Sequence, residues 1–214
     1  MNKHPLISML TLAVLATTAA PAMAQQSHTE GNWMVRVRAL SLDPSNKFDS
    51  KQPGVVADNA VDVNDKWIPE VDISYFFTKN IAAELVLTVP QKHNVSVDGA
   101  GKIGTFKHLP PSLLLQYHFN PEGQFRPYVG AGINYTLLGS EKMNVLGGEV
   151  KLENNSFGGV LQLGFDYKIS KNVFFNVDVK KIQLRTDVMH SAAGNLGTLK
   201  VDPLLWGVGI GYRF

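Results

Sequence analysis

The chain has 214 residues, of which 44% are hydrophobic and 18% charged, and it contains 19 glycines and no cysteine. This is too apolar for a disordered chain, the net charge of +2 gives no electrostatic case for nucleic-acid binding, and the lack of cysteine excludes disulfides and thiolate metal sites. The mean hydropathy of −0.03 is that of an ordinary soluble protein, but the order of the residues indicates a membrane protein.

The chain begins with the features of an export signal. A lysine among the first three residues precedes an apolar stretch from Leu6 to Ala20, and Ala22-Met23-Ala24 forms an A-x-A cleavage pattern. A membrane anchor is the alternative, but the apolar stretch is short for a span and no stop-transfer charges follow it. We therefore expect residues 1–24 to be a signal peptide and residues 25–214 to form one outer-membrane β-barrel domain.

Strand periodicity dominates the remaining chain. Apolar and polar residues alternate in eight segments, and no segment has helical periodicity. Three tight turns alternate with four long polar connections, which is typical of an antiparallel up-and-down barrel with short periplasmic turns. The expected class is all-β, an eight-stranded transmembrane β-barrel. The predicted strands are residues 33–42, 67–77, 81–90, 106–119, 125–139, 156–169, 173–185 and 201–214, and the long connections are 43–66, 91–105, 140–155 and 186–200.

Three features decide that the apolar face points outward to lipid rather than inward, as it would in a soluble barrel. The last strand places Trp206 and its bulky neighbours on one face and glycines on the other, and eight strands enclose only a narrow interior. The polar face carries balanced charges that can pair across it. Aromatic residues gather beside the short turns and the chain ends, which is typical of an interfacial girdle.

The last residues suggest how such a barrel is assembled. The chain ends on a strand with Tyr212 and Phe214 on its apolar face. This pattern resembles the C-terminal signal that barrel-assembly machinery reads on outer-membrane proteins. A strand that ends on aromatic residues by chance is the alternative.

Ordering the inward residues by height predicts an apolar cup above a charged plug. Such a plug would block a continuous water path, whereas the cup could take a small hydrophobic molecule out of water. The alternative is that the cup residues pack against folded-in loops as a small core. The predicted cup comprises Leu40, Leu42, Ile68, Val86, Leu114, Leu138, Val160, Ile182, Leu184 and Leu205, and the predicted plug Arg36, Arg38, Glu70, Asp72, Glu84, Arg126, Asp166, Lys168, Asp178, Lys180 and Arg213.

A molecule that cannot pass the plug must leave sideways, which requires a weak point in the wall. Pro90, Pro110 and Pro111 lie on two neighbouring predicted strands, and each lacks the N–H that a strand ladder needs. We expect a lateral opening there. Ordinary punctuation at strand ends explains the same prolines equally well.

The sequence gives little support for nucleotide binding, metal binding or catalysis. Residues 99–104 match G-x-G-x-x-G, but no helix can readily start after them. The histidines show no metal-ligand spacing, so we expect neither metal nor cofactor. An enzyme would need a residue pair such as His108 and Ser112, but these lie four residues apart on one strand, roughly 13 Å, too far for a hydrogen bond.

Five short motifs are together specific to one family of proteins: residues 77–82 (FTKNIA), 113–119 (LLLQYHF), 127–132 (PYVGAG), 201–203 (VDP) and 211–214 (GYRF). On these motifs the chain resembles the OmpW/AlkL family of small outer-membrane barrels over nearly all of residues 25–214. The resemblance implies an eight-stranded barrel with an apolar lumen that takes up small hydrophobic solutes and releases them laterally into outer-membrane lipid. Some members of the family serve instead as bacteriocin receptors or stress-related surface proteins, so a non-transporting barrel is the alternative.

Overall fold

The computed structural model describes residues 30–54, 56–99, 101–141, 143–145 and 148–214. The expected signal peptide, residues 1–24, lies outside these described residues. Within them the chain forms sixteen strands. No helix among the described residues is long and apolar enough to cross a membrane.

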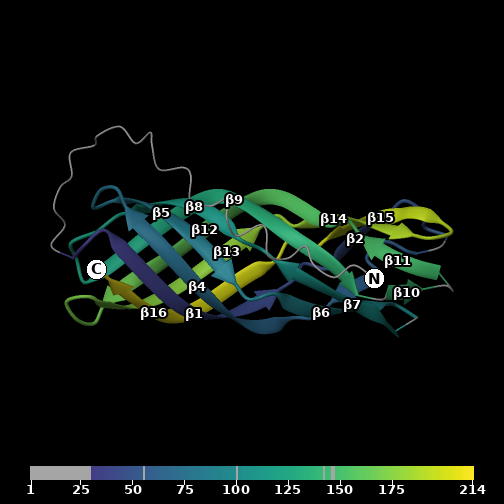
Figure 1. The fold of residues 1–214 in the computed structure, drawn as a ribbon, viewed down its shortest axis with the longest axis horizontal. Helices are drawn as coiled ribbons and strands as arrows, with labels where there is room; N and C mark the ends of the chain where they lie inside the picture. Colours follow the sequence, from purple (N-terminus) through teal and green to yellow (C-terminus); the bar gives the residue numbers. More distant parts are fainter. Residues whose placement is uncertain (1–29, 55, 100, 142, 146–147) are drawn as a thin grey trace, which may run out of the picture.

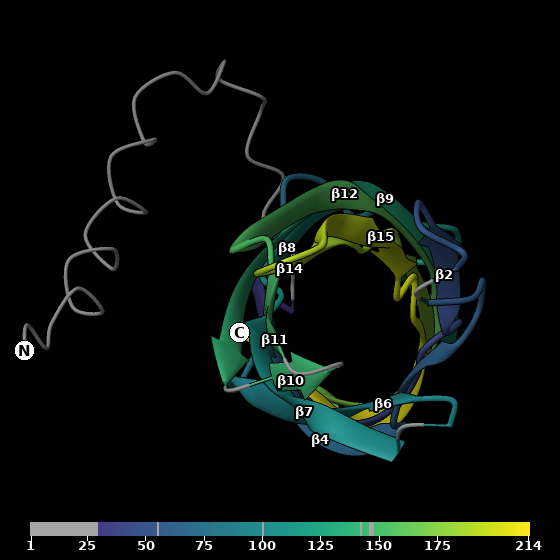
Figure 2. The same ribbon diagram turned by 90° about the vertical axis from the view of Figure 1, so that its right-hand side faces the viewer.

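Eight of the strands close into a barrel, which confirms the expected fold (Figures 1 and 2). Each strand pairs antiparallel with both neighbours, in the order β12-β13-β16-β1-β4-β5-β8-β9, and β9 pairs with β12 to close the ring. Their bounds are close to the predicted ones, except that prolines end β5 early and divide the segment predicted at 106–119. The barrel strands are β1 (Trp33–Asp43), β4 (Lys66–Phe76), β5 (Ile81–Thr88), β8 (Ser112–His118), β9 (Phe125–Glu141), β12 (Asn155–Lys168), β13 (Val173–Ile182) and β16 (Leu204–Arg213).

The long connections, expected to be loops, instead form short strands that extend the wall beyond the barrel; we call this part the outer extension. It gathers at the end of the molecule opposite the C-terminus (Figure 1). These segments also alternate, and their inward residues, such as Phe48, Val95 and Leu152, are buried. The strands are β2 (Lys47–Ser50), β3 (Val61–Val63), β6 (Gln91–Val97), β7 (Gly101–Leu109), β10 (Met143–Val145), β11 (Gly148–Leu152), β14 (Arg185–His190) and β15 (Gly194–Lys200).

The outer face of the barrel is apolar, as expected for a wall in contact with lipid. Leu115 and Leu161 are 58% and 66% exposed, although polar side chains on the same strands are buried. Aromatic pairs border this face near the chain ends, for example Tyr212 and Phe214 with ring centroids 6.0 Å apart. Trp67 and Trp206, at 5.1 Å, lie toward the outer extension. Two aromatic borders around an apolar band are typical of a membrane-spanning barrel.

Glycines on β16 make room for the arginines of β1. A Cβ on Gly209 would lie 2.2 Å from the Val37 carbonyl oxygen and 2.7 Å from Cγ of Arg38. Gly211 lies opposite Arg36 in the β1–β16 register. The inward face of β16 is therefore kept small so that long charged side chains can cross the interior.

Candidate functional site

Arg36 is the centre of a buried network of charges in the half of the barrel nearer the C-terminus. Its Nε and Nη2 donate to the two carboxylate oxygens of Asp166, at 3.1 and 2.7 Å. Its Nη1 donates to Glu84 and to Ser74 Oγ, both at 2.7 Å. All four side chains are buried. Two hydrogen bonds to one carboxylate fix the guanidinium plane and strengthen the ion pair.

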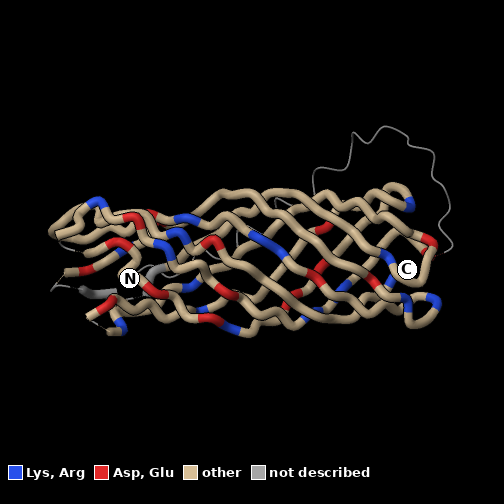
Figure 3. Tube along the Cα trace, turned by 180° about the vertical axis from the view of Figure 1, so that it is seen from behind, with Lys and Arg blue, Asp and Glu red and all other residues tan. Residues whose placement is uncertain are grey.

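Arg38 and Lys180 form the next layer of this network, which we call the charged plug. A guanidinium nitrogen of Arg38 lies 3.0 Å from Asp178 and 3.3 Å from Glu70, and another lies 3.1 Å from Asp72. The ammonium of Lys180 donates to Glu70 at 2.7 Å and Asp178 at 2.6 Å. Acidic and basic positions thus interleave along this part of the barrel (Figure 3). The plug side chains bridge β1, β4, β5, β12 and β13 across the interior.

Sequence reasoning overlooked a neutral side chain of the plug, Tyr128 on β9. Its hydroxyl accepts a hydrogen bond from Asn176 at 3.0 Å, its ring lies 5.4 Å from the Arg36 guanidinium carbon, and it is fully buried. Strand parity carried the signal, because Tyr128 shares the face of Gly130 and Gly132. Gln162 also belongs here, donating to Glu84 and Asp178 at 2.8 and 2.7 Å.

Three residues predicted in the plug lie instead at the mouth of the barrel beside the C-terminus. Arg126, Lys168 and Arg213 surround the carboxylate of Glu30, which Arg126 binds through two hydrogen bonds of 2.6 and 2.9 Å. Burial alone would raise the pKa of the Glu30 carboxyl, but hydrogen bonds from Arg126 and Lys168 lower this pKa to about 2. Sequence reasoning missed Glu30 because it precedes the first predicted strand. These three cations therefore close the mouth rather than pair with the plug acids.

On six strands the charged plug gives way to apolar side chains: a polar plug residue is followed two positions outward by a buried apolar residue. The pairs are Arg38 and Leu40, Glu70 and Ile68, Glu84 and Val86, Gln116 and Leu114, Gln162 and Val160, and Lys180 and Ile182. Four buried polar residues lie beyond this boundary, namely Ser112, Asn134, Thr136 and Ser156 on β8, β9 and β12.

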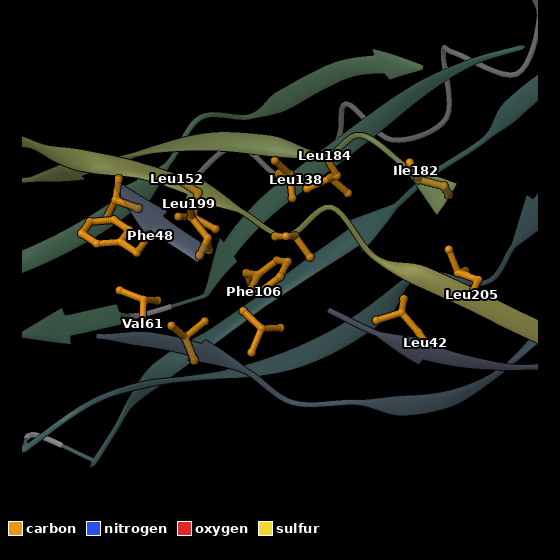
Figure 4. Packing of buried hydrophobic residues seen from close by; sticks show 14 of the residues in the cluster. Leu42, Phe48, Val61, Phe106, Leu138, Leu152, Ile182, Leu184, Leu199 and Leu205 are labelled. Atoms are coloured by element: carbon orange, nitrogen blue, oxygen red, sulfur yellow. The ribbon is translucent and has the colours of Figure 1, made fainter. Parts of the chain in front are cut away.

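The ten predicted cup residues all lie beyond this boundary and are between 0 and 6% exposed. They form one continuous cluster with apolar residues of the outer extension, including Phe48, Phe106 and Leu199 (Figure 4). We call this cluster the apolar column. Within the outer extension, a small apolar cavity of about 20 Å³ lies beside Phe48 and Leu199.

The wall beside the apolar column is interrupted at the predicted prolines. Pairing of β5 with β8 ends at Val86 and Ser112, and pairing of β6 with β7 begins at Gln91 and His108. From Val86 to Gln91, five residue steps or roughly 16 Å along the strand, the described residues form no ladder between the two sides. We call Leu87–Pro90 and Leu109–Pro111 together the proline seam.

The equivalent junction on the other side of the barrel is bridged. Between β12 and β14 the backbone N–H of Gln183 donates to the Gly159 carbonyl at 2.9 Å, and that of Arg185 donates to Ser156 Oγ at 3.1 Å. In the proline seam, Pro111 is tied instead to β9, where its carbonyl accepts from Tyr135 N at 3.1 Å. The proline seam is therefore the weaker junction, and Val86 of the apolar column lies at its inner edge.

Two histidines that sequence reasoning left unpaired meet at the outer edge of the proline seam. Nε2 of His93 and Nε2 of His108 are 3.1 Å apart, and both rings are buried. They lie on β6 and β7, and only the strand register could have revealed their contact. The pair considered earlier, His108 and Ser112, is not joined: Ser112 Oγ accepts from Asn134 Nδ2 at 3.0 Å.

The histidine pair predicts a loss of stability in acid. Burial, and then the neighbouring His93, lower the pKa of His108 to about 3, and burial also lowers the pKa of His93. Because the unfolded chain binds these protons near pH 6.5 and the folded chain does not, folding weakens as the pH falls through the window from about 6.5 toward 3. We expect a loss of about 2 kcal/mol between pH 6.5 and 4.5 that is specific to His108.

Urea unfolding of the wild type and of His108→Phe at the two pH values measures this loss. The carboxylates titrate in both proteins, so the difference between the two pH dependences isolates the histidine. Equal pH dependences would contradict the prediction.

The comparisons with known proteins agree with this architecture. The sequence profile of the OmpW family matches residues 29–214. The chain is 41% identical over 199 residues to an uncharacterized outer-membrane protein, y4mB, of Sinorhizobium fredii, covering 91% of this chain and 85% of that protein. The crystal structure of the outer membrane protein OprG from Pseudomonas aeruginosa aligns with a TM-score of 0.74 and 30% identity, over 87% of this chain and 97% of that one.

One further relative is named after a metabolic operon. The dibenzothiophene metabolism operon protein PahQ of Pseudomonas aeruginosa is 27% identical over 213 residues, covering 92% of this chain and 93% of that protein.

Proposed function

The chain belongs to the OmpW family of outer-membrane proteins, and we propose that it provides a path for small hydrophobic molecules from the cell exterior into the outer membrane. Such a molecule would enter the apolar column from the outer extension and leave sideways through the proline seam. The observation that carries this proposal lies on β5: Val86 is the first residue of the apolar column after Glu84 of the charged plug, and it is also the last residue that pairs with β8.

The plug supports sideways rather than straight passage. Its cations and carboxylates are fully buried and bonded to each other, and separating them in a dry interior costs several kcal/mol per charge. An apolar molecule offers nothing to compensate the freed charges. Leaving through the proline seam requires that Leu87–Pro90 and Leu109–Pro111 move apart, and among the described residues no ladder joins these two segments to each other.

The name of one relative supports the hydrophobic class of the solute. A protein from an operon for dibenzothiophene metabolism shares nearly the full length of this chain. An aromatic sulfur compound of that kind is apolar and poorly soluble in water. A path that keeps the solute in contact with apolar side chains would suit such a molecule.

A barrel that transports nothing is the second candidate function, and the burial of the apolar column in one continuous cluster favours it. Because this cluster joins residues of the barrel to residues of the outer extension, the column could serve to hold the outer extension in shape as a receptor surface. The two functions differ in whether the side chains of the apolar column move aside to admit a solute.

Uptake into vesicles distinguishes the two functions. We expect vesicles with lipopolysaccharide in their outer leaflet to take up naphthalene several times faster when they contain the protein, read by energy transfer to a dye in the bilayer. Leu184→Asp should slow this uptake at least threefold, because a carboxylate in the apolar column raises the cost of entry. Lys151→Asp, on an exposed side chain of the outer extension, is the matched control.

Two outcomes of this experiment would contradict uptake. Equal rates with and without protein would leave the non-transporting barrel as the function. If Leu184→Asp unfolds the barrel, seen as loss of its heat-dependent migration on gels, the apolar column acts as a core whose packing the fold cannot lose.

The role of the last strand in assembly stays a prediction. Tyr212 and Phe214 point to the lipid side, 51% and 55% exposed, where a folding machine can reach them. We propose that they form the signal for barrel-assembly machinery.

A further inference from the structure

The two histidines at the outer edge of the proline seam form a chain of hydrogen bonds with a defined direction. Nδ1 of His93 lies 3.1 Å from the backbone carbonyl oxygen of Asn64, and Nε2 of His93 lies 3.1 Å from Nε2 of His108. His93 and His108 are 1% and 4% exposed. The chain therefore runs from the Asn64 carbonyl through both rings to Nδ1 of His108.

The direction follows from what each atom can do. A carbonyl oxygen only accepts, so Nδ1 of His93 must carry the proton. In a neutral ring, Nε2 of His93 is then a bare acceptor, and Nε2 of His108 must donate to it. Burial lowers the pKa of both rings, which keeps them neutral at pH 7. Nδ1 of His108 is consequently a lone-pair acceptor.

That acceptor has no partner among the described residues. Nδ1 of His108 is buried without a hydrogen bond. Around the His108 ring lie the Phe106 ring, with the two ring centroids 5.9 Å apart, Leu138 opposite in the β7–β9 register, and the buried Gln91 opposite in the β6–β7 register. A second orphan, the hydroxyl of Thr88, is buried in the proline seam itself. Buried polar atoms are normally bonded, and an acceptor left unpaired beside a proposed exit needs an explanation.

We propose that Nδ1 of His108 accepts a hydrogen bond from the hydroxyl group of the passing solute, so that the preferred solutes are small apolar molecules with one O–H donor, such as a phenol or an aliphatic alcohol. This inference rests on the proposed uptake function and narrows its substrate class. A ketone or an ether fails here because it presents an acceptor to an acceptor. A charged group would lose its hydration shell on entering this buried site, which is costly.

The site lies where such a solute would turn outward. His108 is the last paired residue above the proline seam, and Val86 is the last paired residue below it. A phenol held at Nδ1 of His108 would keep its ring against the apolar column. Thr88, within the seam, would offer a second partner as the hydroxyl moves toward the membrane interface.

Two solutes of the same shape test the proposal: p-cresol, with a hydroxyl, and p-xylene, with a methyl group in its place. Dissociation constants for both are measured by NMR titration of the full chain in lipid nanodiscs, for the wild type and for His108→Phe, which keeps an aromatic ring but no acceptor. We expect the preference for p-cresol over p-xylene to fall about threefold to tenfold in the variant, the worth of one hydrogen bond. Thr88→Val removes the second unpaired group, the Thr88 hydroxyl, and should reduce the preference for p-cresol by a smaller factor.

A measurement on the wild type alone guards against a variant that fails to fold. Titration with p-cresol should shift the ¹⁵N signal of His108 Nδ1 in the direction of a hydrogen-bonded acceptor, and p-xylene should not. If both solutes bind with the same preference in the two proteins and the ¹⁵N signal stays fixed, the inference is wrong and the uptake function stands. If neither solute binds, both fail.

Discussion

Replacing Arg36 by leucine should lower the free energy of unfolding by about 3–5 kcal/mol, the range measured when one partner of a buried ion pair is removed. The substitution leaves Asp166 and Glu84 buried without the guanidinium that binds both of them through three hydrogen bonds of 2.7 to 3.1 Å. Neither carboxylate can reach water, because both side chains are fully buried. The loss is therefore much larger than that of any exposed pair.

Urea unfolding in lipid vesicles, followed by tryptophan fluorescence, measures this effect. Lys79→Leu is the matched control, because Lys79 pairs with Glu122 while their side chains are 44% and 73% exposed, and such pairs contribute at most about 1 kcal/mol. Arg36→Lys should give an intermediate loss, since an ammonium keeps the charge but cannot bind Asp166 in two places. Similar losses for Arg36→Leu and Lys79→Leu would show that the plug is not a structural centre.

The barrel could be predicted because strand parity is a local property. Val35 and Arg36 point to opposite sides whatever their partners are, so the sequence alone assigned one to lipid and the other to the interior. The same parity placed Leu40 above Arg38 and so predicted where the polar interior ends. Which cation meets which carboxylate could not be predicted: Arg36 and Asp166 are 130 residues apart, and only the register of the closed barrel brings them together.

The outer extension shows where local patterns fail. Its strands are short, as few as three residues in β3, and their polar composition is typical of loops. They are strands because their inward residues, such as Phe48 and Val95, find apolar partners that come from other connections. For the same reason the contact of His93 with His108 escaped prediction, since it depends on how β6 pairs with β7.

A disulfide across the proline seam should reduce naphthalene uptake at least tenfold, and reduction of that disulfide should restore it. The chain has no cysteine, so Val89→Cys with Leu109→Cys introduces a single possible bond. Continuing the β5–β8 register into the proline seam places Val89 across from Leu109. A disulfide forms only where two Cα atoms come within about 7 Å, so the bond captures the two sides of the seam close together. The bond would hold the two sides of the seam at the distance of paired strands and leave no gap for a solute.

Leu85→Cys with Leu113→Cys is the control that separates closing the seam from merely adding a bond. These residues already lie opposite each other in the β5–β8 ladder and face lipid, 38% and 52% exposed. The same crosslink there should leave uptake unchanged, because that part of the wall is closed in the native barrel. If uptake is unaffected by the bond at Val89 and Leu109, solutes leave the apolar column by another route. If both bonds slow uptake equally, general stiffness of β5 and β8 limits the rate, and the prolines do not mark the exit.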